Sequence, residues 1–222
     1  MMMNKHGTLF VRIVEERQRQ PAIWDPHLYQ SAKASALFGD YVEVRGLRRS
    51  ASDSSSPFRP IEYGDISGGD HLTFRLEEAN QQGAVQVAPS RFCLIGERAL
   101  LMGTMRAYLG NIIVTPRAAW LGRRGPLSFA VKSEFVQLVP RDGMVYFWWA
   151  VGRSASFLAN LPAGGGGTRP RLQPATLAAT PVRVPELEQR AALNAQLEKS
   201  AAREWREWHR LRAILDSLGM NA

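Results

Sequence analysis

A chain of 222 residues is long enough for one ordinary domain with an extension, or for two small domains, and 45% hydrophobic residues suffice for a packed core. The single cysteine excludes an intramolecular disulfide and a cysteine-based zinc cluster, and it fits the reducing cytoplasm, where we expect the protein. The longest apolar run, Met144 to Val151, is far too short to span a bilayer, so we expect no membrane partner.

The net charge of +8 is concentrated in the middle of the chain. Residues 91–171 carry eleven Lys and Arg against three Asp and Glu, an excess that equals the charge of the whole chain. A basic excess confined to one segment is typical of proteins that bind a polyanion. Charge alone favours nucleic acid, but it does not separate DNA from RNA or from an anionic membrane.

Short apolar segments divided by turn residues predict a mostly-β domain with a few helices, an α+β fold, over residues 1–185. We expect strands at 7–14, 40–47, 84–87, 92–95, 99–102, 111–115, 127–131, 134–139 and 181–184. We expect helices at 33–38, 144–160 and 172–179. The Ser-rich stretch at 50–57 and the Gly run at 163–167 are expected to be loops.

The end of the chain, 186–222, predicts one long helix from Glu186 to Leu218. Pro185 suits a first helical turn, Glu188 places negative charge at the positive end of the helix dipole, and Gly219 is a natural stop. Apolar residues recur mostly three or four positions apart, so they form one stripe: Leu187, Ala191, Leu193, Leu197, Ala201, Trp205, Trp208, Leu211, Leu215 and Leu218.

This helix is longer than a compact domain of this size requires, since about 1.5 Å per residue gives roughly 50 Å. Part of the stripe is therefore expected to pack on another helix. The residues expected to meet that partner helix are Leu193, Leu197, Trp205, Trp208, Leu211 and Leu215. The alternative is a terminal helix that caps its own domain.

The sequence offers no catalytic constellation. The glycines at 164–167 are not followed by Gly-Lys-Ser/Thr, which favours a flexible loop over a phosphate-binding loop. The four histidines lack ligand spacing, and neither a Gly-x-Ser-x-Gly turn nor an Asn/Asp-Pro-Pro-aromatic run is present. We therefore expect a non-catalytic protein without a metal or a cofactor of its own.

Arginines and one tyrosine in the basic segment are candidates for nucleic-acid contact. Arg106 and Tyr108 lie in a Gly-bounded loop between two apolar strands; arginine can fork to guanine or phosphate, and tyrosine can stack or donate. Each residue alone is as well explained by solvation, but together they favour contact with DNA. The candidate DNA-binding residues are Arg106, Tyr108, Arg117, Arg123, Arg124, Arg169 and Arg171. Trp148 and Trp149 are expected in the core.

Several motifs follow one another in an order that resembles a known family. They are Glu62-Tyr-Gly-Asp-Ile-Ser67, the stretches 96–114 and 128–139, Thr168-Arg-Pro-Arg-Leu172, and Val184-Pro-Glu-Leu-Glu-Gln189 before the long helix. This order resembles the target-recognition domain and conserved helix of the DNA-specificity (S) subunit of Type I restriction–modification systems. The Pro-x-Leu-x-Gln start of the helix is the most specific piece. The family's Gly-Asp-x-Leu element departs here to Gly96-Glu97-Arg98-Ala99-Leu100.

The resemblance, which runs from Trp24 to Leu218, implies a half-subunit, because S subunits usually carry two recognition domains, each followed by a helix. It implies a two-fold homodimer that reads a two-part duplex DNA site, with helix length setting the gap. The implied partners are an adenine-N6 methyltransferase subunit, which would hold the S-adenosylmethionine, and a restriction translocase. The competing hypotheses are a basic scaffold for RNA or an acidic protein, and an enzyme whose site the sequence does not show.

Overall fold

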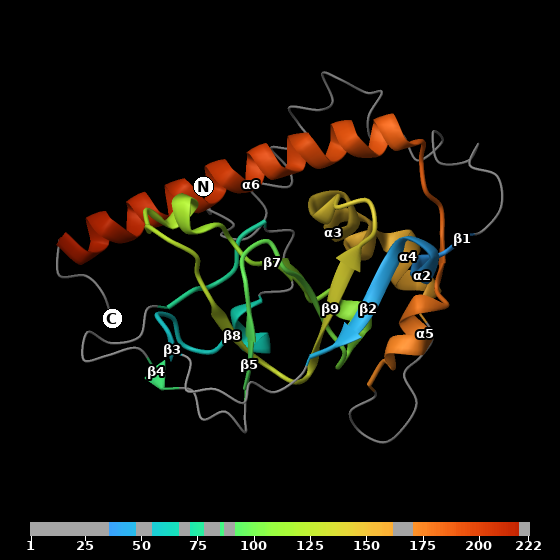
Figure 1. The fold of residues 1–222 in the computed structure, drawn as a ribbon, viewed down its shortest axis with the longest axis horizontal. Helices are drawn as coiled ribbons and strands as arrows, with labels where there is room; N and C mark the ends of the chain where they lie inside the picture. Colours follow the sequence, from blue (N-terminus) through green and yellow to red (C-terminus); the bar gives the residue numbers. More distant parts are fainter. Residues whose placement is uncertain are drawn as a thin grey trace, which may run out of the picture.

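A four-stranded antiparallel sheet forms the centre of the molecule (Figure 1). The computed structural model describes residues 36–47, 55–66, 72–77, 85–86, 92–161 and 171–217. The sheet has the order β2 (Val42–Gly46), β9 (Phe135–Pro140), β6 (Leu100–Gly103) and β7 (Ile112–Val114). All residues of β6 and β7 are buried, which is why these strands are continuously apolar rather than alternating.

Three short antiparallel pairs surround this sheet. They are β5 (Phe92–Ile95) with β8 (Phe129–Lys132), β1 (Ala36–Leu37) with β10 (Pro181–Val182), and β3 (Ser55–Ser56) with β4 (Val85–Gln86). Three 3₁₀ turns connect strands: η3 (Tyr63–Asp65), η4 (Ala107–Leu109) and η5 (Ala118–Leu121). The predicted α+β class is confirmed, and a strand overlaps every predicted strand range in the described part, although β6, β8 and β9 each end one residue beyond the predicted range. The strand predicted at 7–14 lies outside the described residues.

The helix predicted at 144–160 is two helices, α3 (Val145–Arg153) and α4 (Ala155–Asn160). The break is at Ser154, whose backbone is extended and whose hydroxyl accepts from the Phe157 N–H at 3.2 Å. This capping bond makes Ser154 the start of a new helix. Helix α5 (Pro174–Ala178) lies where predicted. The helix predicted at 33–38 is wrong in its described part, because Ala36 and Leu37 pair with β10 as β1 and α2 (Phe38–Tyr41) begins only at the end of that range. The loop predicted at 50–57 is wrong at Ser55 and Ser56, which pair with β4 as β3.

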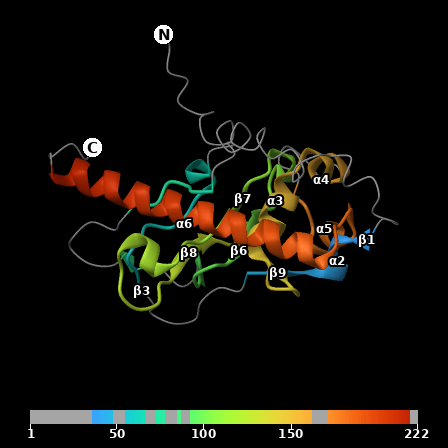
Figure 2. The same cartoon turned by 90° about the horizontal axis from the view of Figure 1, so that it is seen from above.

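Helix α6 (Leu187–Ser217) lies along one side of the head, the name used here for residues 36–182 (Figures 1 and 2). Its inner face packs against α3 and η5, and Leu193, Leu197 and Trp205 are 8%, 3% and 0% exposed. Trp205 also meets Phe74 edge to face, with ring centroids 5.1 Å apart. These three side chains complete the chain's own core.

The expectation that Leu193, Leu197 and Trp205 meet a partner helix is therefore corrected. The apolar stripe is real, but most of it covers the head, as in the alternative of a helix that caps its own domain. Among the described side chains of α6, large apolar residues stay exposed at both ends of the helix, Leu187 at 57% and Leu211 at 53%, the latter beyond the half-buried Trp208. Among the described helices, none has both the length and the apolar content that crossing a lipid bilayer requires.

Candidate nucleic-acid interface

The loop between β6 and β7 presents Arg106 and Tyr108 to solvent. Arg106 has φ 48° and ψ 47°, a left-handed conformation that is uncommon for a residue other than glycine. It starts the turn η4, in which Tyr108 is 60% and Leu109 48% exposed, and Gly110 ends the turn at φ 65°. The loop thus exposes a guanidinium, a phenol and an aliphatic side chain side by side.

Tyr63 holds the base of this loop. Its hydroxyl donates to the Glu134 carbonyl at 3.0 Å and accepts from the Met105 N–H at 3.2 Å. Thr104 donates to the same carbonyl at 2.8 Å. Burial raises the pKa of Tyr63, so the phenol keeps the proton that it donates. A Cβ added at position 103 would lie 2.4 Å from the Tyr63 ring, so the close packing of this ring on β6 requires glycine at that position.

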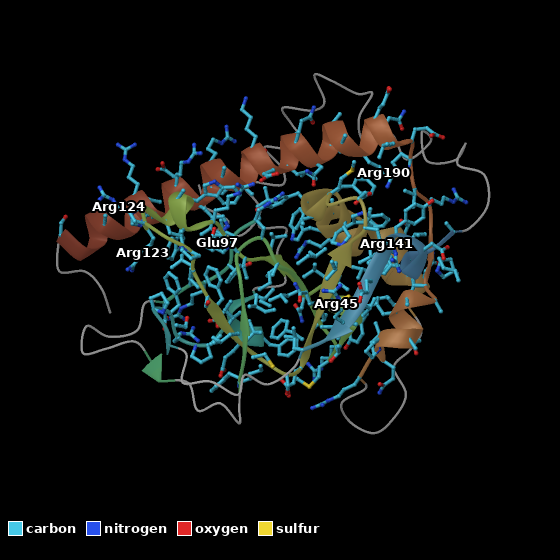
Figure 3. All side chains as sticks on the ribbon, in the orientation of Figure 1. Arg45, Glu97, Arg123, Arg124, Arg141 and Arg190 are labelled. Atoms are coloured by element: carbon cyan, nitrogen blue, oxygen red, sulfur yellow. The ribbon has the colours of Figure 1, made fainter. Side chains whose placement is uncertain are left out.

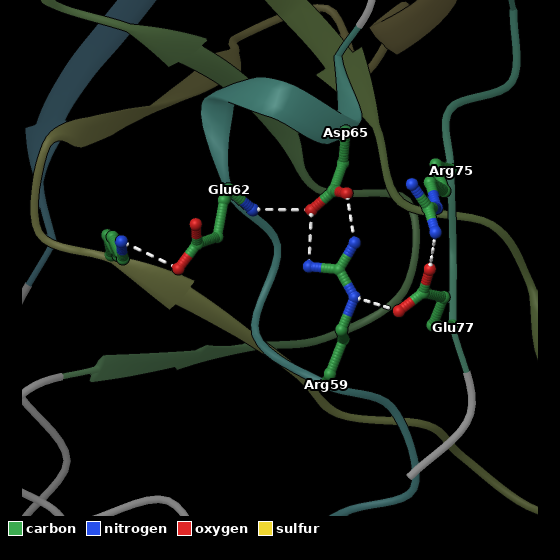
Figure 4. A network of polar contacts seen from close by, with 6 residues as sticks. Arg59, Glu62, Asp65, Arg75 and Glu77 are labelled. Carbon is green, nitrogen blue, oxygen red and sulfur yellow. Dashed lines mark hydrogen bonds and ion pairs between the residues drawn. The ribbon is translucent and has the colours of Figure 1, made fainter.

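An ion-pair network explains why Tyr63 is so placed (Figure 4). Arg59 pairs with both Asp65 and Glu77, and Asp65 also accepts from the Glu62 N–H at 2.8 Å, which closes the turn η3. Burial alone would raise the pKa of Glu77, but hydrogen bonds and charge from Arg59 and Arg75 lower it overall. The described part of the Glu62–Ser67 motif, Glu62–Ile66, is thus a structural support for the loop.

Arg171 joins the same surface. Leu172 donates its N–H to the Thr104 carbonyl at 2.9 Å, and Arg171 pairs with Met105 in an antiparallel bridge. The Arg171 guanidinium lies 3.4 Å from a Glu134 carboxylate oxygen. The structure therefore brings Arg106, Tyr108 and Arg171 together, and we call this set the recognition loop cluster. Arg169 lies outside the described residues.

The end of α3 and helix α4 close the other side of the loop. Arg153 donates to the Gly110 carbonyl at 3.1 Å, and the Leu158 side chain lies behind Gly110. With contacts on both flanks, the backbone of the loop is fixed before any ligand arrives. Preorganisation of this kind lowers the entropy lost on binding.

Arg117 has a different position from the one predicted. Its guanidinium donates to Glu198 of α6 at 2.6 Å and lies over the Trp120 ring at 5.7 Å from the centroid. Arg98, whose backbone is left-handed at φ 55°, contacts the second carboxylate oxygen of Glu198 at 3.3 Å. This side chain therefore ties α6 to the head, and its contact with DNA stays a prediction.

Arg123 and Arg124 follow η5 and lie beside the distal half of α6 (Figure 3). Turn η5 packs on α6, whereas η4 of the recognition loop packs on α4, so the two sets of residues are on different parts of the head. Arg123 is half-buried over the Phe58 ring, while Arg124 is exposed. Glu97, the acid in the altered element Gly96–Leu100, accepts a hydrogen bond from the Leu127 N–H at 2.8 Å and fixes the end of this loop. The predicted DNA-binding residues thus fall into two separate groups.

The structure adds four cations that the sequence reasoning missed. Lys199, Arg203, Arg206 and Arg210 are all exposed on α6. Counting charges over the whole helix hid them, because its acidic and basic residues balance. A helical projection would have found them, since they are four, three and four positions apart and so share one face.

No protein-family model matches the sequence, and no curated protein matches it. Among solved structures, the chain is similar to the HsdS subunit from Thermoanaerobacter tengcongensis, at 17% identity and a TM-score of 0.42, over 96% of this chain and 56% of that one. A structure described as the basis of complex assembly and conformational transition of the type I R-M system gives 18% identity and a TM-score of 0.42, over 96% and 54%. This chain spans about half the length of either. The first of these structures is named as an HsdS subunit, and the second is described as a structure of the type I R-M system.

Proposed function

We propose that this chain is a non-catalytic, sequence-specific subunit that binds duplex DNA in a Type I-like restriction–modification complex. The observation that carries the proposal is the recognition loop cluster: an exposed arginine and tyrosine on a rigid loop, beside a second arginine, within the basic segment of the chain. The order of the sequence motifs supports the same function.

The chemistry of the cluster suits base recognition. An arginine can donate two hydrogen bonds to O6 and N7 of one guanine, and a good bidentate pair gives about 1–3 kcal/mol of discrimination against a wrong base. Tyr108 adds a donor and a ring face on which a base or sugar can pack. Arg171 is placed to contact a neighbouring phosphate or base edge, at the cost of its weak contact with Glu134.

In this proposal the chemistry belongs to partner subunits. The chain selects the site and directs an adenine methyltransferase, which holds the S-adenosylmethionine, and a restriction subunit acts from the same complex. Two copies form a homodimer that reads a two-part site. Because Leu193, Leu197 and Trp205 are already buried, the copies meet through the distal end of α6, where Trp208, Leu211 and Leu215 lie.

Selection of binding sites from random duplexes, followed by sequencing, tests the proposal. The wild-type protein, alone or with the methyltransferase, should enrich one sequence. Arg106→Ala and Tyr108→Ala should each weaken binding to that sequence by roughly 5- to 150-fold, the equivalent of about 1–3 kcal/mol, and leave binding to random duplex nearly unchanged.

Two comparisons make this test specific. Arg123→Ala with Arg124→Ala should weaken target and random duplex alike, because contacts to phosphate carry no sequence information. Arg45→Ala, on the far strand β2, should change neither. Failure to enrich any sequence would refute the proposal, and equal or tighter binding to RNA or to polyglutamate would favour the basic scaffold instead.

A further inference from the structure

The outer face of α6 carries a row of cations, Lys199, Arg203, Arg206 and Arg210, which we call the basic row. At about 100° per residue the four side chains fall within roughly 60° of one another, and they extend over about 16 Å of the helix. They lie opposite the inner face, where Leu197 and Trp205 are buried against the head. All four are exposed.

The exposed charges of α6 are mostly basic, although the charges of the whole helix nearly balance in number. On the inner face, Glu198 is held by Arg98 and Arg117, and Arg190 pairs with Asp142 of the head. Ala192, Ala195 and Ala213 are exposed next to the basic row on its own face, and the exposed Glu188 lies on the same face eleven positions before Lys199. Glu207, an exposed acid, lies four positions after Arg203 and three before Arg210, so it borders the row on one side.

The composition of the row identifies the kind of ligand. It has no bulky apolar side chain, so it lacks the buried anchor on which protein partners usually depend. Its attraction is electrostatic and regularly spaced, which matches the phosphate backbone of nucleic acid, and guanidinium groups bind phosphate with two parallel hydrogen bonds. A second copy of the row would be repelled. Arg124, exposed beside the distal half of α6, extends the same positive region (Figure 3).

We infer that the basic row, with Arg124, is a second DNA contact that holds phosphates without reading sequence. The choice of DNA as the polyanion rests on the proposed function. The row is on the side of α6 away from the head, whereas the recognition loop cluster belongs to the head, so the two contacts hold different stretches of DNA. The row therefore contributes affinity and salt dependence, and the cluster contributes sequence preference.

The salt dependence of binding to a random duplex of about 30 base pairs, followed by fluorescence anisotropy, tests this contact. Each lost phosphate contact lowers the slope of log K against log salt by about 0.9. The triple variant Arg203→Ala, Arg206→Ala, Arg210→Ala should lower the slope by about 2–3 and the affinity at low salt by about tenfold or more. Because these residues are exposed, its melting temperature should stay close to that of the wild type.

The matched control is Arg45→Ala, Arg141→Ala, Arg183→Ala, which removes the same charge from other exposed positions. It should keep nearly the wild-type slope. A wild-type slope in the row variant, or an equal loss of slope in the control, would overturn the inference. It would also be overturned if polyglutamate bound to the row and displaced the DNA. If the wild type selects no sequence but the row variant still loses slope, the proposed function fails and the phosphate contact stands.

Discussion

Asn194 shows how a single side chain joins the long helix to the head. Its amide oxygen accepts hydrogen bonds from the N–H groups of Tyr146 and Phe147, at 2.9 and 3.2 Å. These are among the first N–H groups of α3, which have no partner within their own helix. The residue before α3, Met144, offers no capping side chain. Helix α6 therefore supplies the cap that α3 lacks.

Asn194→Ala should lower the free energy of unfolding by about 1–2 kcal/mol, because the cap is lost and two N–H groups are left without a partner. Urea denaturation followed by circular dichroism measures the loss. Gln196→Ala, an exposed position on the same helix, is the control and should change stability by less than about 0.5 kcal/mol. Equal midpoints for the two variants would show that Asn194 is not a structural cap.

The sequence predicts the position of a side chain where it depends on neighbouring residues, and fails where it depends on a partner that is distant in the sequence. Trp148 and Trp149 are buried as predicted, because two adjacent tryptophans in an apolar run favour burial in the core. Arg117 was expected to meet DNA, but its partner Glu198 is 81 positions away. No pattern near Arg117 indicates that contact.

At the scale of elements, periodicity identifies helix α6 but not the surface that covers its stripe. A stripe of apolar residues three and four positions apart is the same whether a second helix or the chain's own sheet lies against it. The strands of the four-stranded sheet match the predicted ranges to within one residue at their ends, or lie inside them, because short apolar runs and turn residues are local signals. Its order, β2-β9-β6-β7, depends on long-range pairing that those signals do not contain.

The variant Trp205→Ala tests whether the apolar stripe of α6 is covered by the head or by a second helix. Trp205 is fully buried against the head, so its truncation should lower the free energy of unfolding by about 3–5 kcal/mol, with a cost independent of protein concentration. Thermal denaturation across a hundredfold range of concentration measures it. Leu211→Ala, at an exposed position on the same helix, should cost little. A loss for Trp205→Ala that disappears at high concentration would instead place this residue in a dimer interface.

Across the whole molecule, the predicted DNA-binding arginines separate into a recognition loop cluster on the head and a cationic face beside distal α6. The Gly-bounded loop between two strands made Arg106 and Tyr108 visible in the sequence. Arg171 joins them only because Met105 pairs with it across a distance in sequence of 66 positions, which the fold alone provides. The basic row was missed because acids elsewhere along α6, such as Glu198 and Glu207, cancel its charge in number.

This distribution of charge also limits how two copies can associate. Pairing through the outer faces of α6 in parallel would set the basic row of one copy against that of the other, and like charges repel. Contact between two rows is therefore disfavoured, and we assign the proposed homodimer to the distal apolar end, where Leu211 is 53% exposed. Leu211→Glu should weaken self-association at least about tenfold, equivalent to about 1.4 kcal/mol, in sedimentation equilibrium.

Leu187→Glu is the matched control, since Leu187 is 57% exposed at the other end of the same helix. Both variants should retain the monomer's stability, because neither side chain is part of the core. A wild-type protein that remains monomeric at every concentration would remove the homodimer from the proposal. A dimer disrupted by Leu187→Glu and not by Leu211→Glu would place the contact at the start of α6, where Ala191, Ala192 and Ala195 are exposed and the basic row is absent.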